Sequence, residues 1–408
     1  MTTRRFVVLA RRISLIPKLG VGTLAPVAPL AILVALAGLA MISCGPPAPL
    51  VIGGLIPETG TAAVYGRPIR KGMDLAVEEL NAGGGILGGR SLLVDYHDTG
   101  TQGEIAEREA IDLLDSGVAA VIGPAASSVA LHLVPLFKQR QIVLLSPAAS
   151  SPELTSEGGD WFFRVYPSDV GEGIRMANFC RDMVLSKVAV VAVEDSFGKG
   201  VADIFTDRYQ APTRRVVYRE DFSGRLTSAK AREIARELAR SEAEAVYIAA
   251  YVDDMADLLK AIDAAKLNIA RLATSAVTKQ LVAKTGEAAE GLVFPRPAFE
   301  LDNPAPQFQQ FLSSYHAKYD EEPDTFAVHG YDAVKVLALA IDKAGAPRPA
   351  EIRKELLNLD YDGASGHINF DLNGDVVQHP RLYAIYHGEI VSYERFREAM
   401  VGKSILAR

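Results

Sequence analysis

Apolar residues along the chain follow two periods, and each period predicts one kind of element. Residues 50–55 form a short apolar run with glycines, which is typical of a buried strand. The segment after it places five apolar residues on one face of a helix, at helical spacing: Ile69, Met73, Ala76, Val77 and Leu80. A strand followed by an amphipathic helix is therefore the first unit of the chain.

The same unit recurs further along the chain. Strands are expected at 92–95, 119–122 and 142–145, with helices at 104–116 and 128–140 between them. Alternation of this kind implies right-handed crossovers and a mostly parallel sheet with helices on both faces.

A second series of alternating elements follows. Residues 188–193 are nearly all Val and Ala, as in a strand buried on both faces, and 227–240 form a charged amphipathic helix. Further strands are expected at 245–249 and 270–275, on either side of a helix at 255–266. The pattern predicts an α/β protein with two doubly wound, Rossmann-like lobes.

The rhythm breaks after residue 292, where prolines accumulate. Helices are expected to resume at 308–319 and 331–344. The tail from residue 368 onward is expected to form strands, with a turn at Asn373-Gly374.

The first 43 residues have the layout of a signal peptide, because basic residues precede an uncharged apolar stretch at 24–43. Ser43 followed by Cys44 resembles a bacterial lipobox, in which the peptide is cut before a cysteine whose thiol carries a diacylglycerol. Residues 1–43 would then be removed, and 44–49 would form a lipid-anchored linker.

The alternative is an uncleaved transmembrane anchor, since about 20 apolar residues can span a bilayer. Pro26 and Pro29 shorten the unbroken helical part and favour cleavage. With either outcome the rest of the chain is expected beside a bacterial membrane, in the periplasm or at the cell surface.

The composition narrows the classes of partner. The chain of 408 residues has a formal net charge of -7, which argues against a nucleic-acid partner. Cys44 and Cys180 are its two cysteines, so we expect no intrachain disulfide and interpret Cys180 as a small buried hydrophobe. The histidines show no spacing typical of a metal site, and no cofactor is expected.

Two consecutive loops are candidates for ligand binding. Each follows a predicted strand and begins a helix, one at 123–128 and the other at 146–153. In open α/β sheets the binding crevice lies beyond the carboxyl ends of the strands, next to helix N-termini whose free amides favour anions. Ser127 and Ser150 could add O–H donors for a ligand carboxylate, although both serines could equally serve only as helix caps.

Seven segments, spread in order over nearly the whole chain after residue 44, resemble the leucine/isoleucine/valine-binding proteins. They are GTAAVYG (60–66), GMDLAVEELNAGGGI (72–86), VIGP (121–124), SPAASSPEL (146–154), DSFGKG (195–200), AAEG (288–291) and GYDA (330–333). The resemblance implies a type I periplasmic binding protein, whose two lobes are joined by three hinge crossings and deliver a small ligand to an ABC permease. It places residues 50–168 and 294–362 in the first lobe, and 169–293 and 363–400 in the second.

The resemblance also implies a set of ligand-binding residues. Ser127, Ala148, Ala149 and Ser150 would surround the ligand carboxylate. From the first lobe Tyr65 would form an aromatic wall, and from the second Phe197 and Tyr251 would close over the ligand. Asp169 would lie near the hinge and face the cleft.

One position departs from the family pattern. Where the amino-acid binders place an acidic residue to pair with the ligand ammonium, this chain has Ser275, and an ammonium buried without an anionic partner would cost several kcal/mol. Two hypotheses follow: the ligand is a small carboxylate or amide, or it is an amino acid, the family default, whose ammonium contacts Asp169 or Asp253.

The sequence supports an enzyme less well than a binding protein. Residues 196–199 and 284–286 match two of three signatures of penicillin-recognising serine enzymes, but the third is absent, so no catalytic residue is expected. A ligand-sensing receptor or regulator of the same fold, without a dedicated permease, remains the alternative to transport.

Overall fold

The computed structural model describes residues 47–400. The expected signal peptide at 1–43 and the expected lipidation site, Cys44, lie outside the described residues. In the part of the chain that the structure describes, no helix combines the length and the apolar character needed to cross a bilayer.

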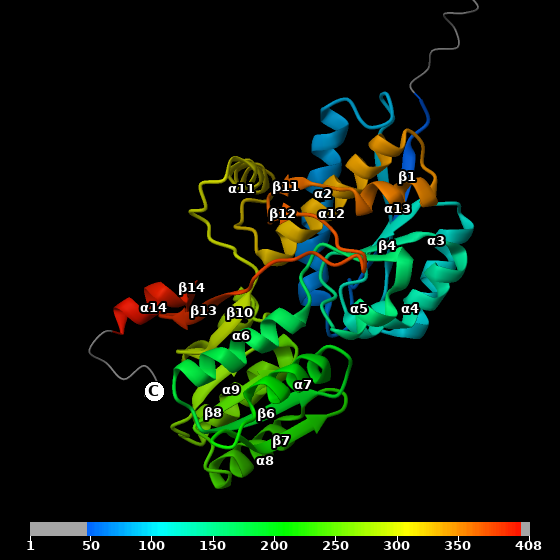
Figure 1. Ribbon diagram of the computed structural model, residues 1–408. Helices are drawn as coiled ribbons and strands as arrows, with labels where there is room; N and C mark the ends of the chain where they lie inside the picture. Colours follow the sequence, from blue (N-terminus) through cyan, green and yellow to red (C-terminus); the bar gives the residue numbers. More distant parts are fainter. Residues whose placement is uncertain (1–46, 401–408) are drawn as a thin grey trace, which may run out of the picture. The chain divides into compact units, whose positions relative to one another are not determined.

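The first lobe is built on a parallel sheet of five strands, in the order β2-β1-β3-β4-β5. The strands are β1 (Leu50–Ile56), β2 (Leu92–Asp98), β3 (Ala120–Ile122), β4 (Val143–Ser146) and β5 (Phe162–Arg164). The helices of this lobe are α2 (Ala63–Ala82), α3 (Gly103–Asp115), α4 (Ser127–Arg140), α5 (Glu153–Glu157), α11 (Pro306–Tyr319), α12 (Thr325–Ala344) and α13 (Pro349–Leu357), with the short hairpin of β11 (Tyr361–Gly363) and β12 (Gly366–Ile368). Two helix pairs, α2 with α12 and α3 with α4, pack on the sheet (Figure 1).

The second lobe contains a sheet of seven strands, in the order β14-β13-β10-β9-β8-β6-β7. Its strands are β6 (Lys187–Val193), β7 (Arg215–Phe222), β8 (Ala245–Ala249), β9 (Ala270–Ala273), β10 (Val293–Arg296), β13 (Arg381–Tyr386) and β14 (Glu389–Ser392), of which β13 and β14 run antiparallel to their neighbours. Its helices are α6 (Asp169–Asp182), α7 (Gly198–Tyr209), α8 (Ser228–Arg240), α9 (Val252–Ala264), α10 (Lys279–Thr285) and α14 (Tyr393–Ala399). Every residue of β8 is buried, as expected for a central parallel strand covered on both faces.

The α2–α12 pair depends on close backbone approach at two glycines. A Cβ added to Gly72 would lie 1.9 Å from the carbonyl oxygen of Ala327, and one added to Gly330 would lie 2.3 Å from that of Ile69. Because no side chain fits at either position, these glycines let the two helices cross at short range.

The chain passes between the sheets three times: after β5, after β10 and before β13. The lobe boundaries differ from the expected ones at two places. Residues 294–296 belong to β10 of the second sheet, and residues 363–375, expected in the second lobe, lie against the first. The reason is specific pairing: Asp375 forms a bridge with Arg164 of β5, and the backbone N–H of Arg164 donates to the carbonyl of Gly374 at 2.9 Å.

Cys180 is fully buried in the second lobe among apolar side chains, and burial raises the pKa of its thiol to about 12. This confirms its interpretation as a small buried hydrophobe.

Candidate functional site

A cleft with about 410 Å³ of space, part of it open to solvent, lies between residues of the two lobes. Alanine, serine and aromatic residues form its walls, and within residues 47–400 no charged side chain is among those that line it. The lining residues are Ala62, Tyr65, Ala125, Ala126, Ser127, Ala148, Ser150, Tyr166, Phe197, Tyr251, Ser275, Ala276 and Phe326.

The first-lobe wall consists of the two loops that follow β3 and β4. Ser127 is the first residue of α4, and its Oγ accepts the backbone N–H groups of Ser150 and Ser151, each at 3.1 Å. Ser127 therefore ties the two loops together, and its own O–H remains available for a ligand. The N-cap of α4 is Ala126, which offers no side-chain cap, so the first amides of the helix are free to bind an anion. These contacts differ from the capping role considered for Ser127.

The β4 loop is shaped by a third serine, which the sequence analysis did not single out. Ser146 Oγ accepts the backbone N–H groups of Ala148 and Ala149 at 3.3 and 2.8 Å and donates to the carbonyl of Pro124 at 2.7 Å. Ala148 lines the cavity, whereas Ala149 is buried behind it. The loop is thus held by its own side chains, which fixes the position of Ser150.

Five aromatic rings form the rest of the wall, and their contacts join the lobes. Tyr65 of α2 donates from its hydroxyl to the carbonyl of Ala276 at 3.2 Å, and its ring centroid lies 4.8 Å from that of Phe326 and 6.3 Å from that of Tyr251. The Phe197 and Tyr251 rings lie 5.4 Å apart. Such contacts leave an apolar interior suited to the body of a small organic ligand.

Tyr166 is the fifth aromatic residue, and its hydroxyl stands apart from the others. Its ring stacks on Phe326 with centroids 5.9 Å apart, and its buried O–H lies beside the side chain of Ser275 without a well-formed hydrogen bond in the described part of the chain. A buried hydroxyl without a partner is costly, so this group is a candidate to contact a ligand.

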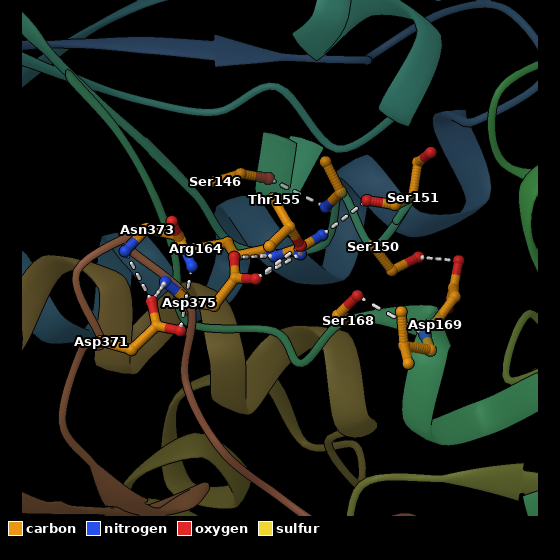
Figure 2. Close-up of polar contacts among 12 residues, drawn as sticks. Ser146, Ser150, Ser151, Thr155, Arg164, Ser168, Asp169, Asp371, Asn373 and Asp375 are labelled. Carbon is orange, nitrogen blue, oxygen red and sulfur yellow. Dashed lines mark hydrogen bonds and ion pairs between the residues drawn. The ribbon is translucent and has the colours of Figure 1, made fainter. Parts of the chain in front are cut away.

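Two buried carboxyl groups lie directly behind the cavity serines. Asp169 begins α6, and its Oδ2 accepts the hydroxyl of Ser150 at 2.8 Å (Figure 2). Glu172, one turn later, accepts the backbone N–H of Ser275 at 2.9 Å. Burial raises the pKa of Asp169 to about 7; burial, and then the charge of Asp169, raise the pKa of Glu172 well above its usual value.

Seven of the nine predicted ligand-binding residues line the cavity: Tyr65, Ser127, Ala148, Ser150, Phe197, Tyr251 and Ser275. Ala149 and Asp169 lie behind its surface. Asp253, the other acid considered for an ammonium, is half exposed and forms an ion pair with Lys284, away from the cavity lining.

Six further residues line the cavity. Ala125 and Ala126 belong to the candidate loop at 123–128 but were not singled out within it, and sequence reasoning missed Ala62, Tyr166, Ala276 and Phe326. Phe326 was missed because α12 begins at Thr325, earlier than the helix predicted at 331–344. Asp324 gave the signal, since its side chain accepts the N–H groups of Phe326 and Ala327 as an N-cap.

Comparison with known proteins identifies the family. The model of the family described as periplasmic binding protein matches residues 49–388, which is most of the chain. The chain belongs to this family. Its members are solute-binding proteins, not enzymes.

Relatives that are named for their ligands are about one quarter identical to this chain in sequence. A leucine-, isoleucine-, valine-, threonine- and alanine-binding protein from Pseudomonas aeruginosa is 27% identical over 323 residues, 78% of this chain and 85% of that protein. The branched-chain amino acid substrate-binding protein LivJ from Streptococcus pneumoniae, solved with isoleucine, is 26% identical with a TM-score of 0.77, covering 84% of this chain and 97% of that one. A leucine-binding protein, LivK, from Thermotoga maritima gives the same identity, coverage and TM-score. The fold of this family member is thus the type I periplasmic binding fold.

Proposed function

We propose that the protein is the extracytoplasmic substrate-binding component of an ABC importer and that it captures a small amino acid or a related carboxylate in the cavity between its lobes. The observation that carries the proposal is the uncapped start of α4 at this cavity, next to the free O–H of Ser127. Free amides at a helix start and a hydroxyl donor match a carboxylate group. The aromatic walls match an apolar body.

Relatives named for leucine, isoleucine and valine support the transport reading. In this proposal the two lobes close around the ligand by motion at the three crossings, and the closed form docks on a permease. The ligand-binding residues are the seven predicted residues that line the cavity, with Tyr166 and Phe326 added.

The test is thermal unfolding of the exported protein, freed of bound ligand by reversible unfolding, with amino acids, their hydroxy-acid analogues and their amides. A ligand at 100 times its dissociation constant adds about 2.7 kcal/mol of stability, which shifts the midpoint by several degrees. We expect leucine or a similar carboxylate to shift it and leucinamide to do so far less. No shift with any carboxylate would contradict the proposal and favour a sensor for another ligand.

We also propose that residues 1–43 are a signal peptide and that Cys44 is lipidated, which would tether the protein beside its permease. Mass spectrometry of the membrane-associated protein is expected to show a lipid-modified N-terminal Cys44. Cys44→Ser is expected to lack the modification. A wild-type protein that retains residues before 44 would instead support the uncleaved anchor.

A further inference from the structure

Two loops of the second lobe carry its aromatic wall. Phe197 lies in the loop between β6 and α7, and Tyr251 lies in the loop between β8 and α9. Strands β6 and β8 are parallel, hydrogen-bonded neighbours in the sheet, so both loops leave the same edge of it side by side. Both rings line the cavity, with centroids 5.4 Å apart. The position of this wall therefore depends on how the two loops are held together.

A single carboxyl group joins the two loops. Asp195 Oδ1 accepts the backbone N–H groups of Phe197 at 3.0 Å and Gly198 at 2.9 Å. Its Oδ2 accepts the hydroxyl of Tyr251 at 2.8 Å. One oxygen thus fixes the backbone that carries the Phe197 ring, and the other fixes the Tyr251 ring itself. In the first lobe, Ser127 joins the loops after β3 and β4 by contacts of the same kind.

The carboxyl of Asp195 lies behind this wall and is not among the described residues that line the cavity. Burial raises its pKa above the usual value, the three hydrogen bonds oppose this shift by stabilising the ionised form, and the charge of Asp254 adds to it. Removing a carboxyl from water is unfavourable, so the bonds to the two loops are what stabilises Asp195 at this position.

The Tyr251 ring reaches across to the first lobe. Its centroid lies 6.3 Å from that of Tyr65, whose hydroxyl donates to the carbonyl of Ala276 in the second lobe. A side chain keeps a binding geometry when packing and hydrogen bonds from behind fix its rotamer. Without the bond to Asp195, the Tyr251 ring is free to turn about its side-chain torsions, which would change the space left for a ligand.

We propose that Asp195 is a positioning residue: it fixes the rings of Tyr251 and Phe197 and thereby sets the size of the apolar ligand body that the cavity accepts. This inference rests on the proposed function and adds a selectivity determinant to the same cavity. The sequence analysis named both rings as ligand contacts but gave Asp195 no role. A ligand with a branched apolar body should reach this wall, whereas a ligand with a single methyl group should not.

The first experiment reports the position of the ring without a ligand. Tyrosine rings are isotope-labelled in the exported protein, and the NMR signal of Tyr251 is the one that is absent in Tyr251→Phe. Ring currents from Phe197 and Tyr65 should shift this signal in the wild-type protein. In Asp195→Ala it should move towards the position of a solvent-exposed tyrosine. Asp195→Asn should keep it near the wild-type position, since an amide can still form hydrogen bonds to both loops.

The second experiment measures selectivity by ligand size. Calorimetry compares leucine with alanine, and 2-hydroxy-4-methylpentanoate with lactate, so that both members of a pair share their polar groups. The affinity for the larger member should fall about tenfold in Asp195→Ala and about threefold in Tyr251→Phe, while that for the smaller member stays within about twofold. A variant that only loosened the fold would lose affinity for both members equally.

Asp254 provides the matched control. It is also a buried acid, in the first turn of α9, and it accepts the backbone N–H of Leu226 at 2.8 Å and pairs with Arg225, outside the cavity lining. Asp254→Asn should lower stability but leave the Tyr251 signal and the size preference unchanged. If Asp195→Ala does not fold, Asp195→Ser replaces it, because serine keeps an acceptor for the first amides of α7 but has no second oxygen for Tyr251.

The outcomes separate this inference from the function on which it rests. An unchanged Tyr251 signal in Asp195→Ala overturns the positioning role, whether or not a ligand binds. Equal losses of affinity for both members of a pair overturn the role in selectivity and leave the proposed function standing. If none of the four ligands binds to the wild-type protein, the proposed function fails together with the selectivity role, and the NMR signal still decides whether Asp195 holds the ring.

Discussion

Two buried acidic sites have members a few residues apart on one stretch of the chain, Arg164 and Asp169, and the surroundings of their carboxyl groups are opposite. Asp375 meets Arg164, which is fully buried, in a two-point contact of 2.6 and 2.8 Å (Figure 2). The same guanidinium donates to the carbonyl of Ser151 at 2.9 Å and to Thr155 Oγ1 at 2.7 Å. By contrast, Asp169 accepts a serine hydroxyl and has the carboxyl of Glu172 as its other hydrogen-bonding neighbour, and it forms no ion pair with a cation in the described residues.

The difference separates a structural site from a candidate binding site. Every contact of Arg164 joins parts of the fold: β5, the loop with Ser151, and the segment before β13 that carries Asp375. This network fixes one crossing against the ligand loop. The Asp169 pair has fewer polar contacts and no counter-ion, and carboxyl groups with raised pKa values of this kind are commonest at functional sites.

The largest effect on stability is expected from disrupting the buried ion pair of Arg164 and Asp375. Asp375→Ala leaves the guanidinium of Arg164 buried without its counter-ion, which should lower the free energy of unfolding by about 3 to 5 kcal/mol. Denaturant unfolding at pH 7 measures this. The double variant Arg164→Met with Asp375→Leu should recover much of the loss, since it removes both charges.

An exposed ion pair provides the control. Asp160 and Arg353 meet at 3.2 Å, with side chains 74% and 29% exposed, so Asp160→Ala should cost no more than about 1 kcal/mol. A loss for Asp375→Ala no larger than this would mean that the buried network does not stabilise the crossing.

A smaller effect, and one that depends on pH, is expected at the other site. The pKa of Asp169 is raised to about 7 from 3.8, so the folded protein holds a proton that the unfolded chain releases between these values. Its contribution therefore makes the wild-type protein less stable as the pH rises through this range. Asp169→Asn removes the titration, and its stability relative to wild type should increase from pH 4 to pH 7 by on the order of 1 to 3 kcal/mol.

Urea unfolding of both proteins at pH 4.5 and 7.5 measures the change. The ligand-free proteins must be compared, because a ligand bound next to Ser150 would change the environment of the Asp169 carboxyl. A stability difference that is the same at both pH values would show that Asp169 ionises normally in the folded protein, and the contrast with Asp375 would then lose its basis.

Of the two acids Asp169 and Glu172, the sequence indicated the first more readily than the second. The family resemblance predicted that Asp169 lies near the hinge, without any prediction of the helix that it begins. Glu172 lies three residues later on α6, a spacing that puts both acids on one face of the helix and could have been noticed. Its contact with Ser275, 103 residues away, depends on how the lobes pack and has no local signal.

The same distinction applies to the fold. The alternating runs predicted both series of strands, because a strand buried on both faces must be largely apolar, as β8 and residues 188–193 of β6 are. The turn at Asn373-Gly374 also forms, with Gly374 at a φ of 77°. Which lobe it joins is decided by Asp375 and Arg164, 211 residues apart, and the prediction assigned it to the wrong one.

The smallest effect on stability is expected at Tyr166, whose buried hydroxyl lies near Asp169 and Glu172 and forms no well-formed hydrogen bond in the described residues. Tyr166→Phe removes an O–H that has no partner in residues 47–400, so the free energy of unfolding without ligand should change by less than about 0.5 kcal/mol. Tyr209 is the matched control, because its buried hydroxyl donates to the carbonyl of Leu185 at 3.0 Å, and Tyr209→Phe should cost about 1 kcal/mol.

Ligand affinity should show the reverse order, with a loss of about three- to tenfold for Tyr166→Phe and none for Tyr209→Phe. Calorimetry with the tightest amino acid of the panel measures it. Equal affinity in the two variants would place the Tyr166 hydroxyl outside the ligand contacts and leave its burial without a functional reason.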